Sequence, residues 1–204
     1  MCPSDDYSHM DLKDLQKVDY TTLLVSLTRY KFVKSILSQQ DAVLEIGCGT
    51  GYGAFFLSKF CKEIKGIDID ADQILKANEY YGCKNVVFQQ LDIFHNPDVI
   101  RNKDVITCFE VIQDMSRKKA FEFLKIINEN KNDNAILFLS TPRKLSENQL
   151  TENRKKYHPH EYTYEELYED LDKIFKRVLI LGQLDEFIGS LNKNNVWTFF
   201  CICI

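Results

Sequence analysis

A short stretch with glycine at every second position constrains this chain more than any other part of it. The apolar segment 42–46 leads directly into GCGTGYG at residues 47–53, and a helix-like segment follows. Glycine adopts positive φ without strain and leaves no Cβ between the backbone and a ligand. A strand, such a turn and a helix N-terminus together form a cradle for part of a nucleotide-like cofactor. This stretch therefore predicts a Rossmann-like α/β domain with a cofactor site.

Short apolar segments of strand type alternate with helical segments along the rest of the chain. We expect strands near 42–46, 63–68, 85–91, 104–109, 134–140, 176–182 and 195–203, with helices near 51–60, 71–81 and 115–130. This alternation predicts a mostly parallel sheet of seven strands with helices on both faces. We expect one domain over residues 1–204, with an N-terminal helical cap over 1–40 because apolar residues recur there at helical spacing.

Composition and charge limit the kind of protein and its partners. The 204 residues are 45% hydrophobic and 27% charged, which is enough apolar material for one substantial core. No apolar run has the roughly 18 residues of a membrane helix, and the first residues do not resemble a secretory signal. Seven scattered cysteines without a C-x-x-C pair indicate reduced thiols, no metal site and a cytoplasmic protein. The net charge of −4 argues against general nucleic-acid binding.

An acidic residue before the glycines distinguishes two interpretations of this stretch. Residues 49–54 also fit the dinucleotide pattern G-x-G-x-x-G/A, which keeps an NAD-dependent dehydrogenase as an alternative. However, E-x-G-x-G-x-G at residues 45–51 resembles motif I of the class I S-adenosylmethionine (SAM)-dependent methyltransferases. GID at 66–68, VVFQQLDI at 86–93 and DVITCFEVI at 104–112 follow at the spacing of that family. The resemblance implies SAM as cofactor, S-adenosylhomocysteine (SAH) as product, and a final antiparallel strand inserted beside the sixth.

The same resemblance implies a set of cofactor contacts. Asp68, which ends the second strand, would bind the two ribose hydroxyls, and Asp92 would contact the adenine amino group. Ile69 and Ile93 would sandwich the adenine, with ordinary core packing as the alternative. The full expected set is Arg29, Glu45, Gly47, Gly49, Gly51, Asp68, Ile69, Asp92, Ile93 and Phe109.

Five members of this set, the three glycines, Phe109 and Arg29, concern the methionine part of SAM or its surroundings. The glycines would let the backbone approach the methionine part closely, and Phe109 begins a loop that would close over it. Arg29 belongs to an Arg-Tyr pair that related enzymes carry before the first strand, where the arginine can meet the SAM carboxylate. A solvated helix arginine is the alternative. We expect Asp70 and Asp72 to cap the following helix rather than to bind the cofactor.

The region after the fifth strand indicates where an acceptor would bind. LSTPR at 139–143 and YHPHEYTYEEL at 157–167 resemble a family branch that reads S-T-P-N … Y-H-x-x-E-Y-T-x-E-E-L. That branch includes many enzymes that methylate sugars or other small molecules. Open α/β sheets bind ligands at the carboxyl ends of their strands, so the polar segment 143–162 lies where a substrate lid is expected.

Two residues are candidates for the catalytic base. His158 in the lid titrates near neutrality, although a loop histidine bonded to backbone is the alternative. Asp114 stands where many relatives have histidine, and it could orient His158, accept a substrate hydroxyl or only cap a helix. We expect both to face the acceptor. Arg143 departs from the asparagine of the branch, and the basic run 154–156 is either a solvated loop face or a site that attracts a phosphorylated acceptor.

Together these patterns predict methyl transfer from SAM to a hydroxyl of a small molecule, such as a sugar, a sugar nucleotide or a polysaccharide precursor. Transfer to a nitrogen or a carboxylate of another small molecule is an alternative, and so is a non-catalytic SAM-binding regulator. The sequence predicts no metal, no membrane and no nucleic-acid partner, and it makes no prediction about oligomeric state.

Overall fold

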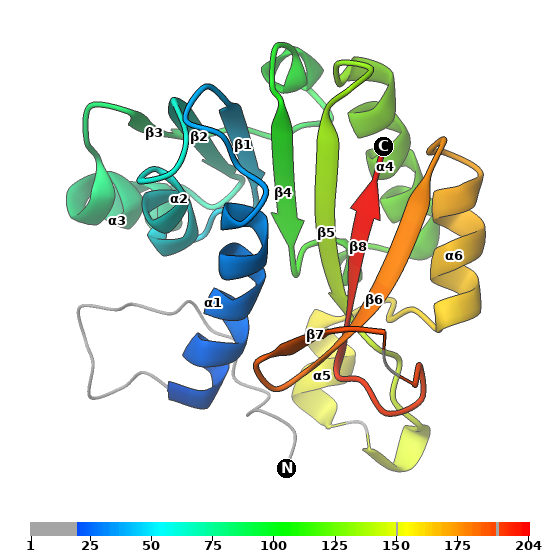
Figure 1. Ribbon diagram of the computed structural model, residues 1–204. Coiled ribbons are helices and arrows are strands. Elements are labelled where there is room, and N and C mark those ends of the chain that lie inside the picture. Colours follow the sequence, from blue (N-terminus) through cyan, green and yellow to red (C-terminus); the bar gives the residue numbers. More distant parts are fainter. Residues whose placement is uncertain (1–19, 150, 191) are drawn as a thin grey trace.

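A twisted sheet forms the centre of the computed structural model, which describes residues 20–149, 151–190 and 192–204 (Figure 1). Within these residues the sheet has eight strands in the order β3-β2-β1-β4-β5-β8-β6-β7. The strands are β1 (Ala42–Ile46), β2 (Glu63–Asp68), β3 (Val86–Gln90), β4 (Val105–Phe109), β5 (Ile136–Pro142), β6 (Val178–Leu184), β7 (Phe187–Gly189) and β8 (Thr198–Cys203). Strands β1 to β5 pair in parallel, whereas β8 is antiparallel to both β5 and β6.

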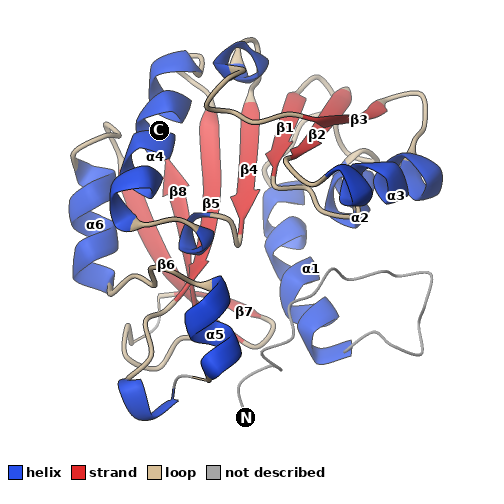
Figure 2. Cartoon of the chain, turned by 180° about the vertical axis from the view of Figure 1, so that it is seen from behind, coloured by secondary structure: helices blue, strands red, loops and turns tan. Residues whose placement is uncertain are grey.

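Helices cover both faces of the sheet, as the front and back views show (Figures 1 and 2). The α-helices are α1 (Tyr20–Lys34), α2 (Tyr52–Leu57), α3 (Ala71–Tyr81), α4 (Arg117–Asn130), α5 (Glu152–Tyr157) and α6 (Tyr164–Asp172). Short 3-10 turns are η1 (Pro97–Ile100), η2 (Ile112–Asp114) and η3 (Glu147–Gln149). Together these elements form a three-layer α/β/α arrangement.

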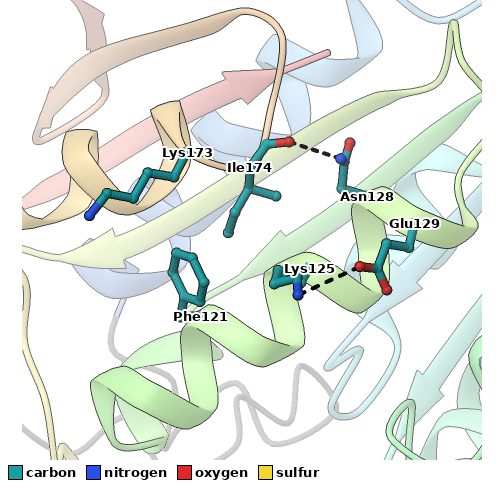
Figure 3. A pocket seen from close by; sticks show the side chains of 6 residues that line it. All are labelled: Phe121, Lys125, Asn128, Glu129, Lys173 and Ile174. Atoms are coloured by element: carbon teal, nitrogen blue, oxygen red, sulfur yellow. Dashed lines mark hydrogen bonds and ion pairs between the residues drawn. The ribbon is translucent and has the colours of Figure 1, made fainter.

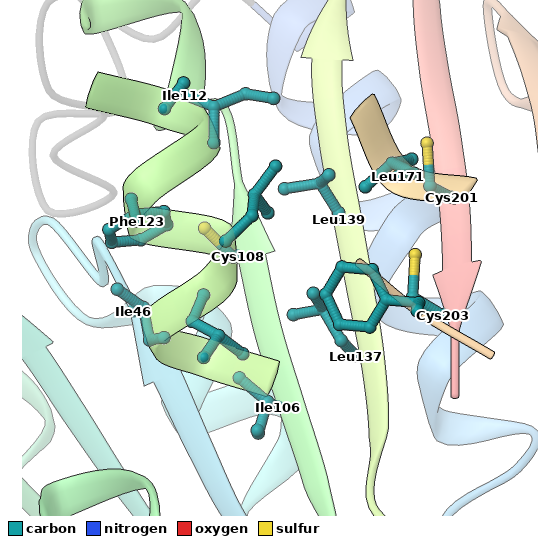
Figure 4. Packing of buried hydrophobic residues seen from close by; sticks show 14 of the residues in the cluster. Ile46, Ile106, Cys108, Ile112, Phe123, Leu137, Leu139, Leu171, Cys201 and Cys203 are labelled. Carbon is teal, nitrogen blue, oxygen red and sulfur yellow. The ribbon is translucent and has the colours of Figure 1, made fainter. Parts of the chain in front are cut away.

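The core lies in two layers because successive side chains of a strand point to opposite faces of the sheet. Leu44 of β1 packs in the layer covered by α4 and α6, where Phe123 and Leu171 contact the sheet (Figure 4). Val43, its neighbour in β1, packs in the other layer with Val33 of α1. Every residue of β1 and β4 is buried, as expected for strands in the middle of a parallel sheet.

Three helices begin at the side chains that the sequence offers as caps. Asp70 accepts hydrogen bonds from the backbone N–H groups of Asp72 and Gln73 at the start of α3. Ser116 caps α4 in the same way, and Thr163 forms a complete capping box with Glu166 at the start of α6. Asp70 therefore caps α3, as predicted, whereas Asp72 lies in the first turn of that helix.

The α/β class, the strand positions and the inserted antiparallel final strand are confirmed, but the predicted number of strands was one too low. The additional strand β7 forms a hairpin with β6 through a two-residue turn, Asp185-Glu186, in which Asp185 has φ of 49°. The sequence lacks the Asn-Gly or Asp-Gly signal that normally marks such a turn. The expected helical cap is helical over α1, and residues 1–19 of that prediction lie outside the described residues. The segment 143–162, which we call the lid, contains η3 and α5.

Candidate functional site

The glycine stretch lies at the carboxyl end of β1, beside the point where the sheet order reverses between β1 and β4. Gly47, Gly49 and Gly51 have φ values of 74°, 50° and 86°, which only glycine adopts readily. A Cβ on Gly47 would lie 2.3 Å from Cγ2 of Val111, so this glycine is also required by packing. A Cβ on Gly49 would meet no atom within 4 Å, and its surroundings are open.

Asp68 ends β2 beside this loop. Its Oδ2 accepts a hydrogen bond from the Gly49 N–H at 2.9 Å, and its Oδ1 accepts one from the Asp70 N–H at 3.0 Å. The carboxylate thus joins the glycine loop to the end of β2 and is only partly buried. This is the position that the sequence predicts for a ribose contact.

The predicted adenine contacts follow β2 and β3. Ile69 is 72% exposed, so its apolar side chain presents an open face beside Asp68. Ile93 is 4% exposed and packs in the core layer with α4, which corresponds to the packing alternative considered for it. The Asp92 carboxylate accepts from the Phe94 N–H at 2.9 Å, and its second oxygen lies 3.0 Å from Nδ1 of the exposed His95. Asp92 is therefore oriented by its own turn.

Glu45 is buried near the end of β1 and bonds to the tyrosine of the Arg-Tyr pair in α1. The Tyr30 hydroxyl donates to Glu45 Oε1 at 2.6 Å, while Oε2 has no hydrogen-bond partner. Burial raises the pKa of Glu45 from 4.5 to about 8, although the hydrogen bond from Tyr30 opposes this change. Burial therefore favours the protonated form of this carboxyl.

Arg29 does not lie in solvent but reaches across the site to the ends of β4 and β5. It donates to Glu110 Oε1 at 2.7 Å and is 5% exposed, and its buried Nε has no hydrogen-bond partner. The Ser140 hydroxyl donates to the same Glu110 oxygen at 2.7 Å. Glu110 has φ of 56°, an unusual backbone conformation for a non-glycine residue. Phe109 lies under this network, with the Arg29 guanidinium 5.9 Å from the centre of its ring.

Asp114 of η2 and His158 of the lid interact electrostatically across the boundary between the two segments. The His160 N–H donates to the Gln113 carbonyl at 3.4 Å, which holds the lid against η2. The Asp114 side chain still reaches solvent, but the surrounding protein raises its pKa from 3.8 to about 6. His158 lies close enough to oppose this rise, whereas the negative charges of Glu110 and Asp68 add to it. Asp114 thus lies within electrostatic range of the lid histidine and of Asp68.

The other lid residues singled out from the sequence have structural contacts. Nε of Arg143 donates to the Val196 carbonyl at 2.8 Å, so the residue that replaces the asparagine of the family branch joins the lid to the loop before β8. Arg154 is buried and pairs with Glu161, so the basic run 154–156 does not act as one solvated patch. The second lid histidine, His160, lies 3.8 Å from Glu166 of α6, and burial lowers its pKa.

Three residues of the site were not predicted as site residues. Glu110 and Ser140 complete the Arg29 network, and Glu161 holds His158. The Y-H-x-x-E-Y motif could have indicated Glu161, because this residue lies three positions after the histidine. Nothing local marks Glu110 or Ser140, which lie 81 and 111 residues from Arg29 in the chain.

The rest of the described chain bears on other kinds of site. No group of three or more histidine, cysteine or acidic side chains comes together among the described residues in a way that could hold a metal ion. In the same residues, no helix is long and apolar enough to cross a membrane. A shallow hollow lies at the opposite, amino-end edge of the sheet, where the last turns of α4 meet the segment after α6 (Figure 3). It is lined by Phe121, Lys125, Asn128, Glu129, Lys173 and Ile174.

Comparison with known proteins decides between the two cofactor interpretations. The family model of a methyltransferase domain matches residues 37–185, which include the glycine loop, Asp68, Asp92 and the lid. The chain belongs to this methyltransferase family. The enzyme is a SAM-dependent methyltransferase, and SAM rather than NAD is its cofactor. No curated protein matches the sequence.

Solved structures show the same class I fold at low sequence identity. The methyltransferase domain of a bacterial Hen1 protein, CtHen1, has a TM-score of 0.67 and 20% identity, covering 88% of this chain and 98% of that one. A complex of DhpI with SAH has a TM-score of 0.67 and 17% identity, and the match covers 95% of this chain and 89% of that one. Magnesium protoporphyrin IX methyltransferase from Synechocystis with bound SAH has a TM-score of 0.63 and 14% identity, and the match covers 97% of this chain and 91% of that one.

The residues at the carboxyl ends of the strands fit SAM chemically. Asp68 offers a partly exposed carboxylate to ribose hydroxyls, and Ile69 offers an uncovered apolar face to a base. Arg29 retains a buried Nε–H without a partner, a donor that suits a carboxylate. The open space beside Gly49 allows close approach of a ligand to the backbone.

Proposed function

We propose that this enzyme transfers the methyl group of SAM to a hydroxyl of a small molecule, with a sugar or a sugar-linked precursor as the acceptor. The observation that supports the proposal is the electrostatic interaction between His158 and Asp114, with Asp68 of the glycine-loop region also acting on Asp114. His158 and Asp114 carry an imidazole and a carboxyl group, two side chains that can accept a proton, and they come from different elements. Methyl transfer to a hydroxyl requires such a group because the oxygen must lose its proton.

SAM supplies a methyl group that is already activated, so the protein has three tasks: to hold the acceptor oxygen, to exclude water and to accept the proton. Alignment of the two reactants contributes about 7–11 kcal/mol, and a positioned base contributes a factor of about 10² to 10⁴. We assign Arg29, Glu45, Gly47, Gly49, Gly51, Asp68, Ile69, Asp92 and Phe109 to the cofactor, and Ile93 to the core packing beside it. His158 and Asp114 are assigned to the acceptor.

Three features support a small hydroxylated acceptor. Among its described residues, the lid that follows the carboxyl end of β5 forms only two short helical segments, η3 and α5. The lid motif resembles that of sugar and small-molecule methyltransferases. Arg154 is bound by Glu161, so a phosphate would have to be attracted by other cations such as the exposed Lys144 and Lys156. A neutral polyol therefore fits the lid better than a phosphorylated acceptor.

The test is an acceptor screen that detects SAH formation with sugars, sugar nucleotides, polyols, amines and carboxylates. With an identified hydroxyl acceptor, we expect His158→Ala and Asp114→Asn each to lower kcat at least about 10²-fold. Since Asp114 must be ionised to attract or relay a proton, the rate of the native enzyme should rise with pH through about 6.

Asp98→Asn, in the exposed turn η1, is the matched control and should leave the rate unchanged. All variants should retain SAH affinity, which calorimetry measures separately. Rates within about threefold of the native enzyme in both site variants would rule out a base at these positions. Turnover with amines or carboxylates alone would replace the proposal with transfer to nitrogen or to a carboxylate.

A further inference from the structure

We propose that Glu161 is a positioning residue that holds the imidazole of His158 in one tautomer and one orientation, and that Arg154 holds Glu161 in turn. This inference rests on the proposed role of His158. It assigns a mechanistic task to a lid carboxylate that otherwise looks like a structural ion pair.

The Glu161 carboxylate is fixed from three directions. Its Oε1 lies 2.8 Å from Nδ1 of His158 and 2.5 Å from Nε of Arg154. Its Oε2 accepts the backbone N–H of Leu145 at 3.3 Å, from the opposite end of the lid. The side chains of Glu161 and Arg154 are 6% and 3% exposed. A buried carboxylate with these partners cannot rotate without breaking several hydrogen bonds at once.

The protonation state of Glu161 determines the tautomer of its histidine partner. Burial opposes ionisation of Glu161, but the hydrogen bonds and charges of His158 and Arg154 outweigh it and lower its pKa. An ionised carboxylate only accepts hydrogen bonds, so Nδ1 of His158 must carry the hydrogen. In a neutral imidazole the lone pair then lies on Nε2, and this atom is the one able to take a proton.

This arrangement has a chemical consequence for an acceptor hydroxyl. As its O–H bond breaks, the proton forms a new bond to Nε2 and gives the imidazole a positive charge. The negative charge of Glu161 stabilises that imidazolium at Nδ1, as the orienting carboxylate does in other histidine bases. Asp114 is the second negative charge that acts on this histidine, from the side of η2. Glu161 does not touch the acceptor, so its contribution passes through His158.

The first experiment measures the tautomer directly and requires no acceptor. Two-bond proton–nitrogen spectra of the ¹⁵N-labelled protein, recorded where imidazole is neutral, distinguish the two tautomers. His158→Ala identifies the signals among the four histidines. We expect the Nδ1–H tautomer in the native protein and a shift toward the Nε2–H tautomer, which a free side chain prefers, in Glu161→Ala. Glu161→Gln keeps the shape of the side chain and should weaken the preference, because its amide can present nitrogen or oxygen to Nδ1.

Thr163→Ala is the matched structural control. It removes a hydrogen bond of the capping box two residues away and costs about 1 kcal/mol, but it should leave the tautomer unchanged. If Glu161→Ala does not fold, Glu161→Gln decides the question. An Nε2–H tautomer in the native protein, or an Nδ1–H tautomer that survives both Glu161 variants, would overturn the proposal.

The second experiment separates positioning from a structural role once an acceptor is known. We expect Glu161→Ala to lower kcat about 10- to 100-fold, less than His158→Ala, with little change in KM. Combining the two substitutions should give an enzyme no slower than His158→Ala alone. A double variant that is markedly slower would show that Glu161 acts independently of His158. If His158→Ala has no effect, the proposed base is wrong, and the tautomer measurement still tests Glu161.

Discussion

Replacing Glu45 with glutamine tests the electrostatics of the cofactor site without any ligand. Glu45 is 2% exposed, accepts the Tyr30 hydroxyl through Oε1 and leaves Oε2 without a hydrogen-bond partner. Burial raises its pKa from 4.5 to about 8. Glu45→Gln preserves the shape and the acceptor for Tyr30 but removes the titrating group.

The direction in which stability changes with pH follows from how many protons the folded and the unfolded states bind. Between the ordinary pKa of 4.5 and about 8 the folded protein holds a proton on Glu45 that the unfolded chain releases. Stability from this group is therefore complete below 4.5 and falls as pH rises toward 8, by up to about 1.4 kcal/mol per pH unit. Across the whole window the loss is on the order of 5 kcal/mol.

The assay is urea unfolding of the native protein and of Glu45→Gln at several pH values between about 5 and 8. The difference between the two unfolding free energies should change by about 3–4 kcal/mol across this range, with the variant gaining relative stability as pH rises. Taking the difference removes the contributions of groups such as Asp114 and His160, which titrate in both proteins. Glu122→Gln, on the exposed face of α4, should show no such trend. A difference that is constant with pH would refute a neutral, buried Glu45.

Two further predictions concern the cofactor loop and use neighbouring residues as controls. Gly47→Ala should weaken SAH binding at least tenfold and destabilise the protein by about 1–3 kcal/mol, because its Cβ would overlap Val111 at 2.3 Å at a positive φ. In Gly49→Ala the positive φ lowers stability, but the new Cβ overlaps no atom. Calorimetry compares the SAH affinities of the two glycine variants, and thermal unfolding compares their stabilities. Asp68→Ala should lose about 1.5–3 kcal/mol of SAH binding, whereas Asp70→Ala should lose about 1 kcal/mol of stability and keep its SAH affinity. Equal SAH affinities in the two aspartate variants would contradict a ribose contact at Asp68.

The sequence predicted the elements whose signals are local. The strands from β1 to β5, the glycine turn and the caps at Asp70 and Thr163 each depend on residues within a few positions of one another. Apolar runs bounded by turn residues specify buried strands, and a capping residue specifies a helix start, so these features need no tertiary information. The hairpin strand β7 was missed because its turn carries no glycine.

The sequence also assigned candidate site residues from a family pattern, but it did not determine their partners. Arg29 was expected either at the cofactor carboxylate or in solvent, and in the structure it pairs with Glu110. Arg154 was expected on a basic surface, but it is buried against Glu161. Burial decides both cases, since a charged side chain that leaves water must find an opposite charge.

By itself, the sequence therefore determined the α/β class and, through its resemblance to motif I, the methyltransferase family. The class follows from local periodicity, and the resemblance rests on a glycine motif that only a few backbone conformations can satisfy. Only the tertiary structure decided that burial raises the pKa of Glu45, that Arg29 and Ser140 meet at Glu110, and that His158 acts electrostatically on Asp114. The reason is that ionisation and ion pairing depend on burial and on distances between residues far apart in the chain, which no local pattern encodes.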